Sequence, residues 1–133
     1  MSWLFTEALI FPIMLSFLSH PSFDKDADGM NRRFSFFDGL HSFKKICEVH
    51  FNPVSPRQVI APGKLHKVKC YGSYIVWKVE IAVKGLKSNQ FPRVWFAVRG
   101  SVVVFLCLAT HIDNYNDNKM DKIADSLVSQ FFN

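Results

Sequence analysis

The sequence lacks the short motifs that mark most small enzymes. Its 133 residues contain no glycine-rich phosphate loop, no nucleophile elbow, no internal repeat and no zinc-ligand spacing. The three cysteines, Cys47, Cys70 and Cys107, are isolated, and this argues against a disulfide scaffold and favours a reducing compartment. We therefore expect neither a metal nor a cofactor, and we expect Cys107, within an apolar run, to be a small buried hydrophobe.

A basic leader and a clear membrane span are also missing. Residues 1–19 are apolar, but they contain Glu7 and Pro12 and lack a basic n-region and a small-residue cleavage site. Their hydrophobic length is marginal for crossing a bilayer. We predict a cytoplasmic chain whose N-terminus packs in the core, with membrane association as the alternative. Residues 3–10 fit a strand or the start of a helix, and residues 13–18 suit a helix after the proline. Periodicity does not separate helix from strand in this stretch.

Apolar and basic residues are plentiful. Hydrophobic residues make up 49% of the chain and include 14 phenylalanines, so a single domain over residues 1–133 can bury a core. Lys and Arg number 16 against 11 Asp and Glu, which gives a formal charge of +5. This balance suggests a polyanion or an acidic protein as a partner, without deciding between them.

The second half of the chain predicts a three-stranded antiparallel meander. Residues 74–83 alternate, with Glu80 on the polar side. Arg99-Gly100 has the composition of a two-residue hairpin turn. Residues 101–109 are almost continuously apolar, as in a strand buried on both faces.

Helical periodicity completes the fold class. Apolar residues at helical spacing predict a helix over residues 31–50, and an unbroken apolar stripe over residues 120–131 predicts another, with N-caps at 116–118. The stripe packs on the sheet or on a partner. We therefore predict an α+β fold: a twisted antiparallel sheet of three to five strands, two N-terminal helices and one C-terminal helix.

An acidic segment resembles half of a calcium loop. Asp24, Asp26 and Asp28 precede a glycine in the D-x-D-x-D-G pattern, but the twelfth position is Ser35, where a bidentate glutamate is needed. We predict an exposed acidic turn over residues 20–31 that does not bind calcium.

The groups able to do chemistry lie at the ends of the predicted strands. His111 ends the longest apolar strand, and Arg93 begins its neighbour, so antiparallel pairing places them at one end of the sheet. A guanidinium beside an imidazole suits a phosphate. Glu80 can face the same groove, and Tyr115 can stack on a base or donate a hydrogen bond. An ordinary strand-end histidine is the alternative.

Four strand motifs follow one another between residues 64 and 112: GKLHKV, WKVEI, RVWFAV and VVVFLCLATH. In this order, after two helices and a proline-rich loop, they resemble the RelE/ParE superfamily of bacterial toxins. Arg93 matches the arginine that opens the family's R-V-x-F strand. His111 matches the basic or histidine position ending the last strand, and Glu80 the acidic residue near the tryptophan. The chain departs from the family at Ile112, where a tyrosine often stands.

The resemblance implies a RelE-like fold with helices on one face of the sheet. It implies the toxin of a toxin–antitoxin pair that cleaves mRNA on the ribosome, without a metal, by attack of the RNA 2′-hydroxyl. Glu80 would be the base, Arg93 the stabiliser of the phosphorane and His111 an acid or base. The groups expected to contact RNA are Lys64, Lys67, Lys69, Arg99 and Tyr115.

The implied protein partner is a cognate antitoxin, for which the C-terminal helix, or the groove it covers, is the expected docking site. Two alternatives remain open. The chain can be a ParE-like protein that blocks DNA gyrase without enzymatic activity, or a small protein-binding or membrane-associated domain.

Overall fold

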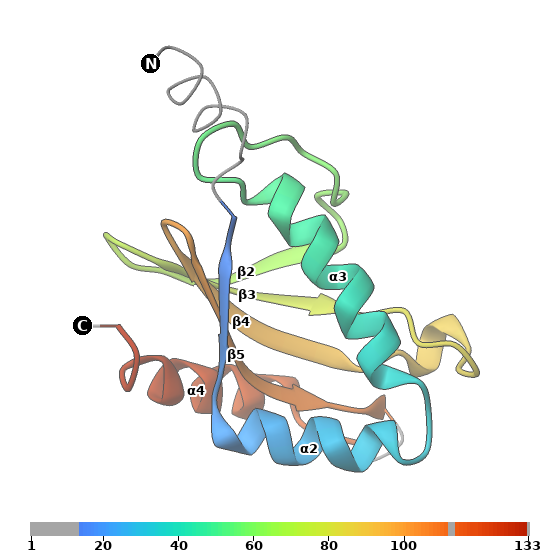
Figure 1. Cartoon of the computed structure of the whole chain (residues 1–133). Coiled ribbons are helices and arrows are strands. Elements are labelled where there is room, and N and C mark those ends of the chain that lie inside the picture. Colours follow the sequence, from blue (N-terminus) through green and yellow to red (C-terminus); the bar gives the residue numbers. More distant parts are fainter. Residues whose placement is uncertain (1–13, 112–113, 133) are drawn as a thin grey trace.

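A five-stranded sheet forms the centre of the molecule (Figure 1). The computed structural model describes residues 14–111 and 114–132. In chain order the elements are β1 (Ser16–Ser19), α2 (Pro21–Asn31), α3 (Phe36–His50), β2 (Leu65–Cys70), β3 (Ile75–Glu80), η1 (Ser88–Gln90), β4 (Arg93–Arg99), β5 (Val102–Ala109) and α4 (Asp117–Val128).

The sheet has the strand order β1-β5-β4-β3-β2. The predicted α+β class is confirmed, and so is the antiparallel meander of β3, β4 and β5. A wholly antiparallel sheet is wrong, because β1 pairs parallel with β5, from Ser16 opposite Val102 to Ser19 opposite Phe105. Between β1 and its partner β5 the chain forms α2, α3 and the strands β2, β3 and β4. A crossover connection, and not a hairpin, therefore joins β1 to β5.

The β4–β5 hairpin turns one residue later than predicted. Arg99 still pairs with Val102, so the two loop residues are Gly100 and Ser101. Gly100 has φ of +57°, a backbone conformation that costs glycine little because it has no Cβ.

Residues 13–18 were predicted to be helical, and this is wrong where the structure describes them, because β1 occupies Ser16–Ser19. The apolar positions alternate as in a strand: Leu15 is buried, and the ring of Phe17 stacks on Phe105 with centroids 6.0 Å apart. Residues 3–10, and the expectation that the N-terminus packs in the core, fall outside the described residues.

The predicted acidic turn over residues 20–31 is also wrong, because this segment is α2. The Nδ1 atom of His20 accepts a hydrogen bond from the Ser22 backbone N–H at 3.1 Å and caps the helix. Phe23, Ala27 and Met30 form the buried stripe at positions i, i+4 and i+7. This apolar spacing, rather than the aspartates, decides the local structure.

The predicted helix over residues 31–50 exists, but it begins at Phe36 as α3. Its glycine has a packing reason. A Cβ atom at Gly39 would lie 2.5 Å from the carbonyl oxygen of Ala82, which follows β3. The absence of a side chain lets α3 lie directly against the chain after this strand.

Helices cover both faces of the sheet, so the expectation of helices on one face is wrong. α2 and α3 enclose one core, which includes Phe36, Phe43, Phe96 and Phe105. α4 encloses a second core on the other face, where its Ala124 and Val128 pack with Val76, Trp95 and Leu106. The predicted stripe of the C-terminal helix therefore packs on the sheet.

The prediction for Cys107 is confirmed: it is buried, and burial raises its pKa to about 12. Within residues 14–111 and 114–132, no helix has the length and apolar character needed to cross a bilayer.

Candidate functional site

The strand ends bring Glu80, Arg93 and His111 together. The last residue of β3, Glu80, pairs with the first residue of β4, Arg93, which in turn pairs with Ala109 of β5, two residues before His111. Arg93 Nη2 donates to Glu80 Oε1 at 3.2 Å, and His111 Nε2 lies 3.6 Å from Glu80 Oε2. One carboxylate thus connects the guanidinium and the imidazole.

An ion-pair network extends from this cluster to the start of α4. Arg93 Nη1 donates to Asp117 Oδ1 at 2.9 Å. Lys78 Nζ lies 2.6 Å from Asp117 Oδ2 and 3.1 Å from Asp121 Oδ1. Trp95 Nε1 donates to the same Asp121 oxygen at 2.8 Å. These bonds attach the first turns of α4 to the sheet. We call Lys78, Arg93, Trp95, Asp117 and Asp121 the α4 clamp.

The α4 clamp favours the ionised forms of Lys78, Arg93 and Asp117. Burial raises the pKa of Asp117, but hydrogen bonds from Lys78 and Arg93 outweigh this and leave it below its usual value. Burial lowers the pKa of Lys78, and its hydrogen bonds to Asp117 and Asp121 outweigh this and raise it. The pKa of Arg93 is raised in the same way.

The charge balance limits what Arg93 offers to a phosphate. The two cations Lys78 and Arg93 face three carboxylates, Glu80, Asp117 and Asp121, which leaves one negative charge when His111 is neutral. The guanidinium, 20% exposed, is already paired with two of these carboxylates. A positive field for RNA has to come from other residues.

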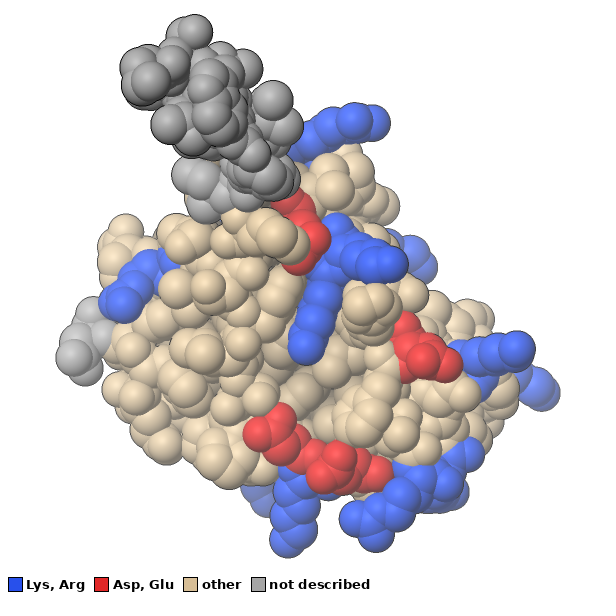
Figure 2. All heavy atoms as spheres, viewed as in Figure 1, with Lys and Arg blue, Asp and Glu red and all other residues tan. Residues whose placement is uncertain are grey.

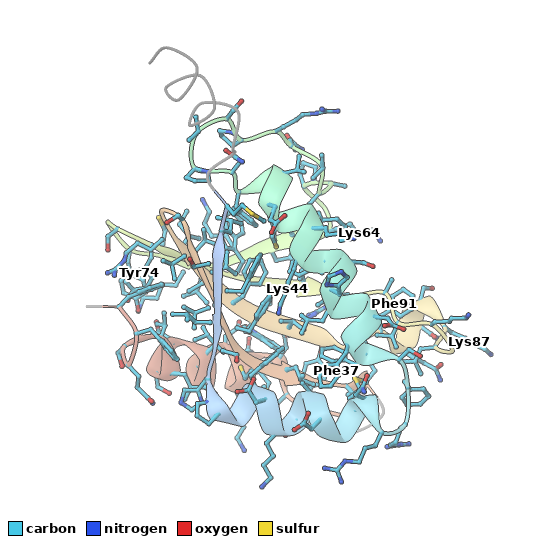
Figure 3. All side chains as sticks on the ribbon, in the orientation of Figure 1. Phe37, Lys44, Lys64, Tyr74, Lys87 and Phe91 are labelled. Atoms are coloured by element: carbon cyan, nitrogen blue, oxygen red, sulfur yellow. The ribbon has the colours of Figure 1, made fainter. Side chains whose placement is uncertain are left out.

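A cavity of about 710 Å³ opens beside Glu80 and His111. It lies where β3 runs past the first residue of the edge strand β2, since the last β2–β3 pair is Leu65 with Val79. Two basic side chains of this edge, Lys64 and His66, also line it. Its wall is apolar and comes from α3, the loop before β2 and the segment before β4: Phe43, Ile46, Val59, Ile60 and Phe91. Figure 3 shows Lys64 and Phe91 on the side of α3 away from β1.

Sequence reasoning did not single out His66 as a site residue. His66 appeared there only within the strand motif GKLHKV. The β2–β3 register, seen only in the structure, sets His66 opposite Lys78, two residues from Glu80 and on the same face of the sheet.

The other residues expected to contact RNA do not join this cavity. The Lys67 ammonium lies over the Trp77 ring at 5.6 Å, and Lys69 pairs with Asp125 at 3.4 Å. The Arg99 guanidinium lies over the Phe132 ring at 4.3 Å, at the far end of the β4–β5 hairpin. The ring of Tyr115 packs against those of His111 and Trp95, at 5.4 and 6.0 Å. Of the predicted RNA-binding set, only Lys64 lines the cavity.

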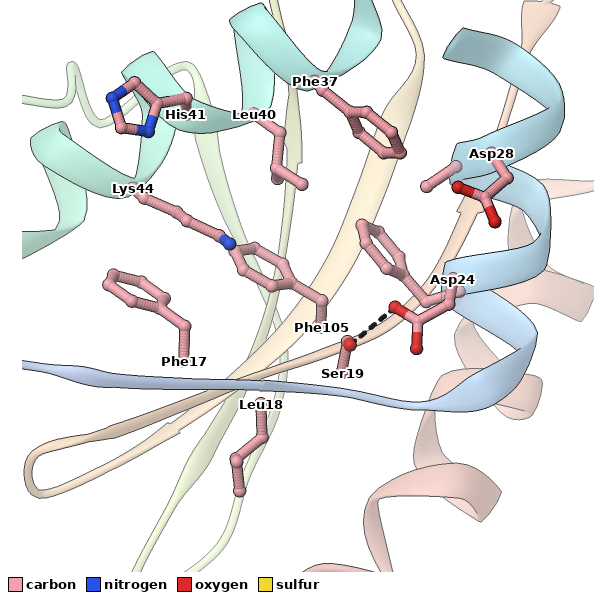
Figure 4. Close-up of a pocket in the computed structure, with 12 residues that line it drawn as sticks. Phe17, Leu18, Ser19, Asp24, Asp28, Phe37, Leu40, His41, Lys44 and Phe105 are labelled. Carbon is pink, nitrogen blue, oxygen red and sulfur yellow. Dashed lines mark hydrogen bonds between the residues drawn. The ribbon is translucent and has the colours of Figure 1, made fainter. Parts of the chain in front are cut away.

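A second cavity, of about 630 Å³, lies between β1, α2 and α3 (Figure 4). Asp24 and Asp28 stand on the α2 side, and His41 and Lys44 on the α3 side. Ser19 Oγ donates to Asp24 at 2.6 Å. Because Asp24 and Asp28 lie on a helix, they cannot wrap around a cation as a calcium loop does. Over the described ranges, no three acidic, histidine or cysteine side chains are grouped as a metal site.

The Glu80–His111 pair beside the larger cavity is the strongest candidate site in the part of the chain that is described. A carboxylate beside an imidazole can accept and deliver a proton. No protein-family model matches the sequence, and comparisons with curated proteins and with solved structures find no match either.

Proposed function

We propose that this chain is the toxin of a toxin–antitoxin pair and that it cleaves mRNA in the cytoplasm, on the ribosome, at the cavity beside Glu80 and His111. One observation carries the proposal: the His111 imidazole lies 3.6 Å from the Glu80 carboxylate at the edge of a 710 Å³ cavity. The two helices that precede the antiparallel meander, and the helix that follows it, support the RelE-like reading.

The reaction needs only proton transfer and electrostatic stabilisation. The RNA 2′-oxygen attacks the adjacent phosphorus as its proton passes to the Glu80–His111 pair. The bond from phosphorus to the 5′-oxygen breaks, and that oxygen takes up a proton. The products are a 2′,3′-cyclic phosphate and a 5′-hydroxyl, so atoms and charge balance without an oxidant or a water molecule.

Arg93 is a positioning residue in this proposal. The resemblance makes it the stabiliser of the phosphorane, but its guanidinium is held by Glu80 and Asp117. It therefore fixes the Glu80 carboxylate and moderates its charge. Lys64, which forms no ion pair among the described residues, is better placed to meet a phosphate.

The site of antitoxin binding remains a prediction. The apolar stripe of α4 is covered by the sheet, so it does not by itself require a partner. Deleting residues 117–133 would uncover the second core and is expected to leave the chain insoluble or unable to bind an antitoxin.

The proposal is tested by asking whether mRNA is cut and whether the cut needs a free RNA 2′-hydroxyl. Induction of the chain in bacteria should arrest growth, and primer extension should map discrete cuts in translated mRNA. Ribosomes programmed with an mRNA carrying a 2′-O-methyl group at the mapped position should resist cleavage there, since the nucleophile is blocked. Cleavage that persists at the methylated position would contradict the proposal.

A gyrase-blocking protein is the second candidate. On the face shown in Figure 2, the Lys and Arg side chains lie mostly around the periphery, with acidic residues among them. Exposed apolar side chains such as Ile46, Val49 and Val59 are suited to a protein surface. Growth arrest without RNA cuts, together with inhibited DNA supercoiling, would establish this candidate instead.

A further inference from the structure

The Glu80–His111 pair supplies one side of the proposed reaction only. The imidazole nitrogen and the carboxylate oxygen are 3.6 Å apart, so the two groups act at the same point. The attacking and leaving oxygens lie on opposite sides of the phosphorus in an in-line displacement. A second proton-transfer group has to face the first across the bound phosphate.

A second imidazole, that of His66, lines the same cavity. It pairs with Lys78 across the β2–β3 ladder, and Glu80 is two residues further along β3 on the same face. Diagonal neighbours of this kind are separated by about 7–8 Å, which leaves room for a phosphodiester between the side chains. Both His66 and Glu80 line the cavity.

The surroundings of His66 suit single-stranded RNA. His66 and Lys64 are exposed, and neither side chain forms a hydrogen bond or ion pair within the described ranges. Lys64, in the turn just before β2, lines the same cavity. Phe91 and the apolar wall offer a surface on which a base can stack, and Asn89 offers hydrogen bonds to a base edge.

We infer that His66 is a catalytic residue, the general acid that protonates the 5′-oxygen, and that Lys64 holds the phosphate. This rests on the proposed function and deepens it. The Glu80–His111 pair accepts the 2′ proton, the 2′-oxygen forms its bond to phosphorus, and the bond to the 5′-oxygen breaks as His66 gives that oxygen its proton. His66 ends neutral and the pair ends protonated.

The experiment uses the full chain with ribosomes programmed with an mRNA carrying one of two linkages at the mapped cut. One linkage is normal, and the other has sulfur in place of the 5′-bridging oxygen. Sulfur leaves without protonation, so it replaces the work of a general acid. His66→Ala should slow cleavage of the normal linkage by about 10²–10⁴-fold and cleave the sulfur linkage nearly as fast as the wild type.

Matched variants separate the possible results. Lys64→Ala should weaken cleavage of both linkages, and Lys122→Ala on α4 should change neither. Thermal melts check that His66→Ala is folded, and His66→Gln replaces it if it is not. Equal slowing of both linkages by a folded His66 variant, or wild-type rates on both, overturns this inference while the proposed function stands. If the wild type cleaves neither linkage, the proposed function fails first.

Discussion

Glu80 separates two differently organised regions. On one side lies the α4 clamp, in which Lys78, Asp117 and Asp121 satisfy one another across 2.6–3.1 Å and tie α4 to the sheet. The cavity lies next to it at the edge of the sheet, where the basic side chains of Lys64 and His66, the latter beside Lys78 in the β2–β3 ladder, form no ion pair among the described residues. Charges that are paired and partly buried hold a structure together, whereas unpaired charges beside a cavity remain available to a ligand.

Glu80 belongs to both regions, so its substitution should have the largest effect. Glu80→Gln removes the charge that orients His111 and should lower mRNA cleavage by about 10²–10⁴-fold. It also removes a half-exposed ion pair with Arg93, which costs no more than ~1 kcal/mol. Cleavage on programmed ribosomes and denaturant melts measure the two effects. Glu48→Gln on α3, outside the cavity, is the matched control and should preserve cleavage.

Gly39 tests how closely the cavity wall depends on α3. Gly39→Ala places a Cβ atom 2.5 Å from the Ala82 carbonyl oxygen, and the strain should lower the free energy of unfolding by about 1–3 kcal/mol. Gly29→Ala in α2 is the control, because its Cβ meets nothing within 4 Å. It should stabilise the helix by up to ~1 kcal/mol. Equal effects of the two substitutions in denaturant melts would refute the close approach of α3.

The α4 clamp should contribute to stability and little to chemistry. Lys78→Met leaves Asp117 and Asp121 without their lysine partner in a partly buried setting, and the free energy of unfolding should fall by about 1–3 kcal/mol. Cleavage per folded molecule should stay within about threefold of wild type, since Lys78 transfers no proton. A loss of cleavage as large as that of Glu80→Gln would mean that the two regions are not separate.

The smallest effect concerns acid stability. The pKa of Asp117 is depressed in the folded state, so its contribution to stability is fully present above the unfolded value of about 3.9 and is lost as the pH falls through the folded value. Asp117→Asn should therefore be less stable than wild type at neutral pH, and the difference should shrink below about pH 4. Asp28→Asn serves as the exposed control. A difference that stays constant from pH 7 to pH 2.5 would exclude this linkage.

Local pattern was enough to predict the meander and the C-terminal helix. Alternation in residues 74–83 predicts β3, and the glycine predicts the β4–β5 turn, although one residue early. Glu80 and Arg93 lie side by side because β3 pairs with β4. Residues 13–18 show the opposite case. Their short apolar run fits either helix or strand, and it becomes β1 because β5 offers it a parallel partner far along the chain.

The candidate site was predictable only in part. That Arg93 is neutralised by Asp117 depends on how α4 docks, which no local pattern specifies. The cavity wall comes from α3 and the loop before β2, distant in sequence from His111. In α2, the aspartates matched a calcium pattern while Phe23, Ala27 and Met30 set the helix. Sequence thus identified the reactive strand ends but not their neighbours.

The most direct measurement of the central claim is the mRNA cleavage rate of His111→Ala set beside its free energy of unfolding. His111 lies at the cavity edge and outside the α4 clamp, with its side chain 37% exposed. The substitution should lower the rate of mRNA cleavage by about 10²–10⁴-fold. The free energy of unfolding should change by no more than ~0.5 kcal/mol. A folded His111→Ala protein that cuts mRNA at the wild-type rate would contradict the account and move the gyrase-blocking function ahead.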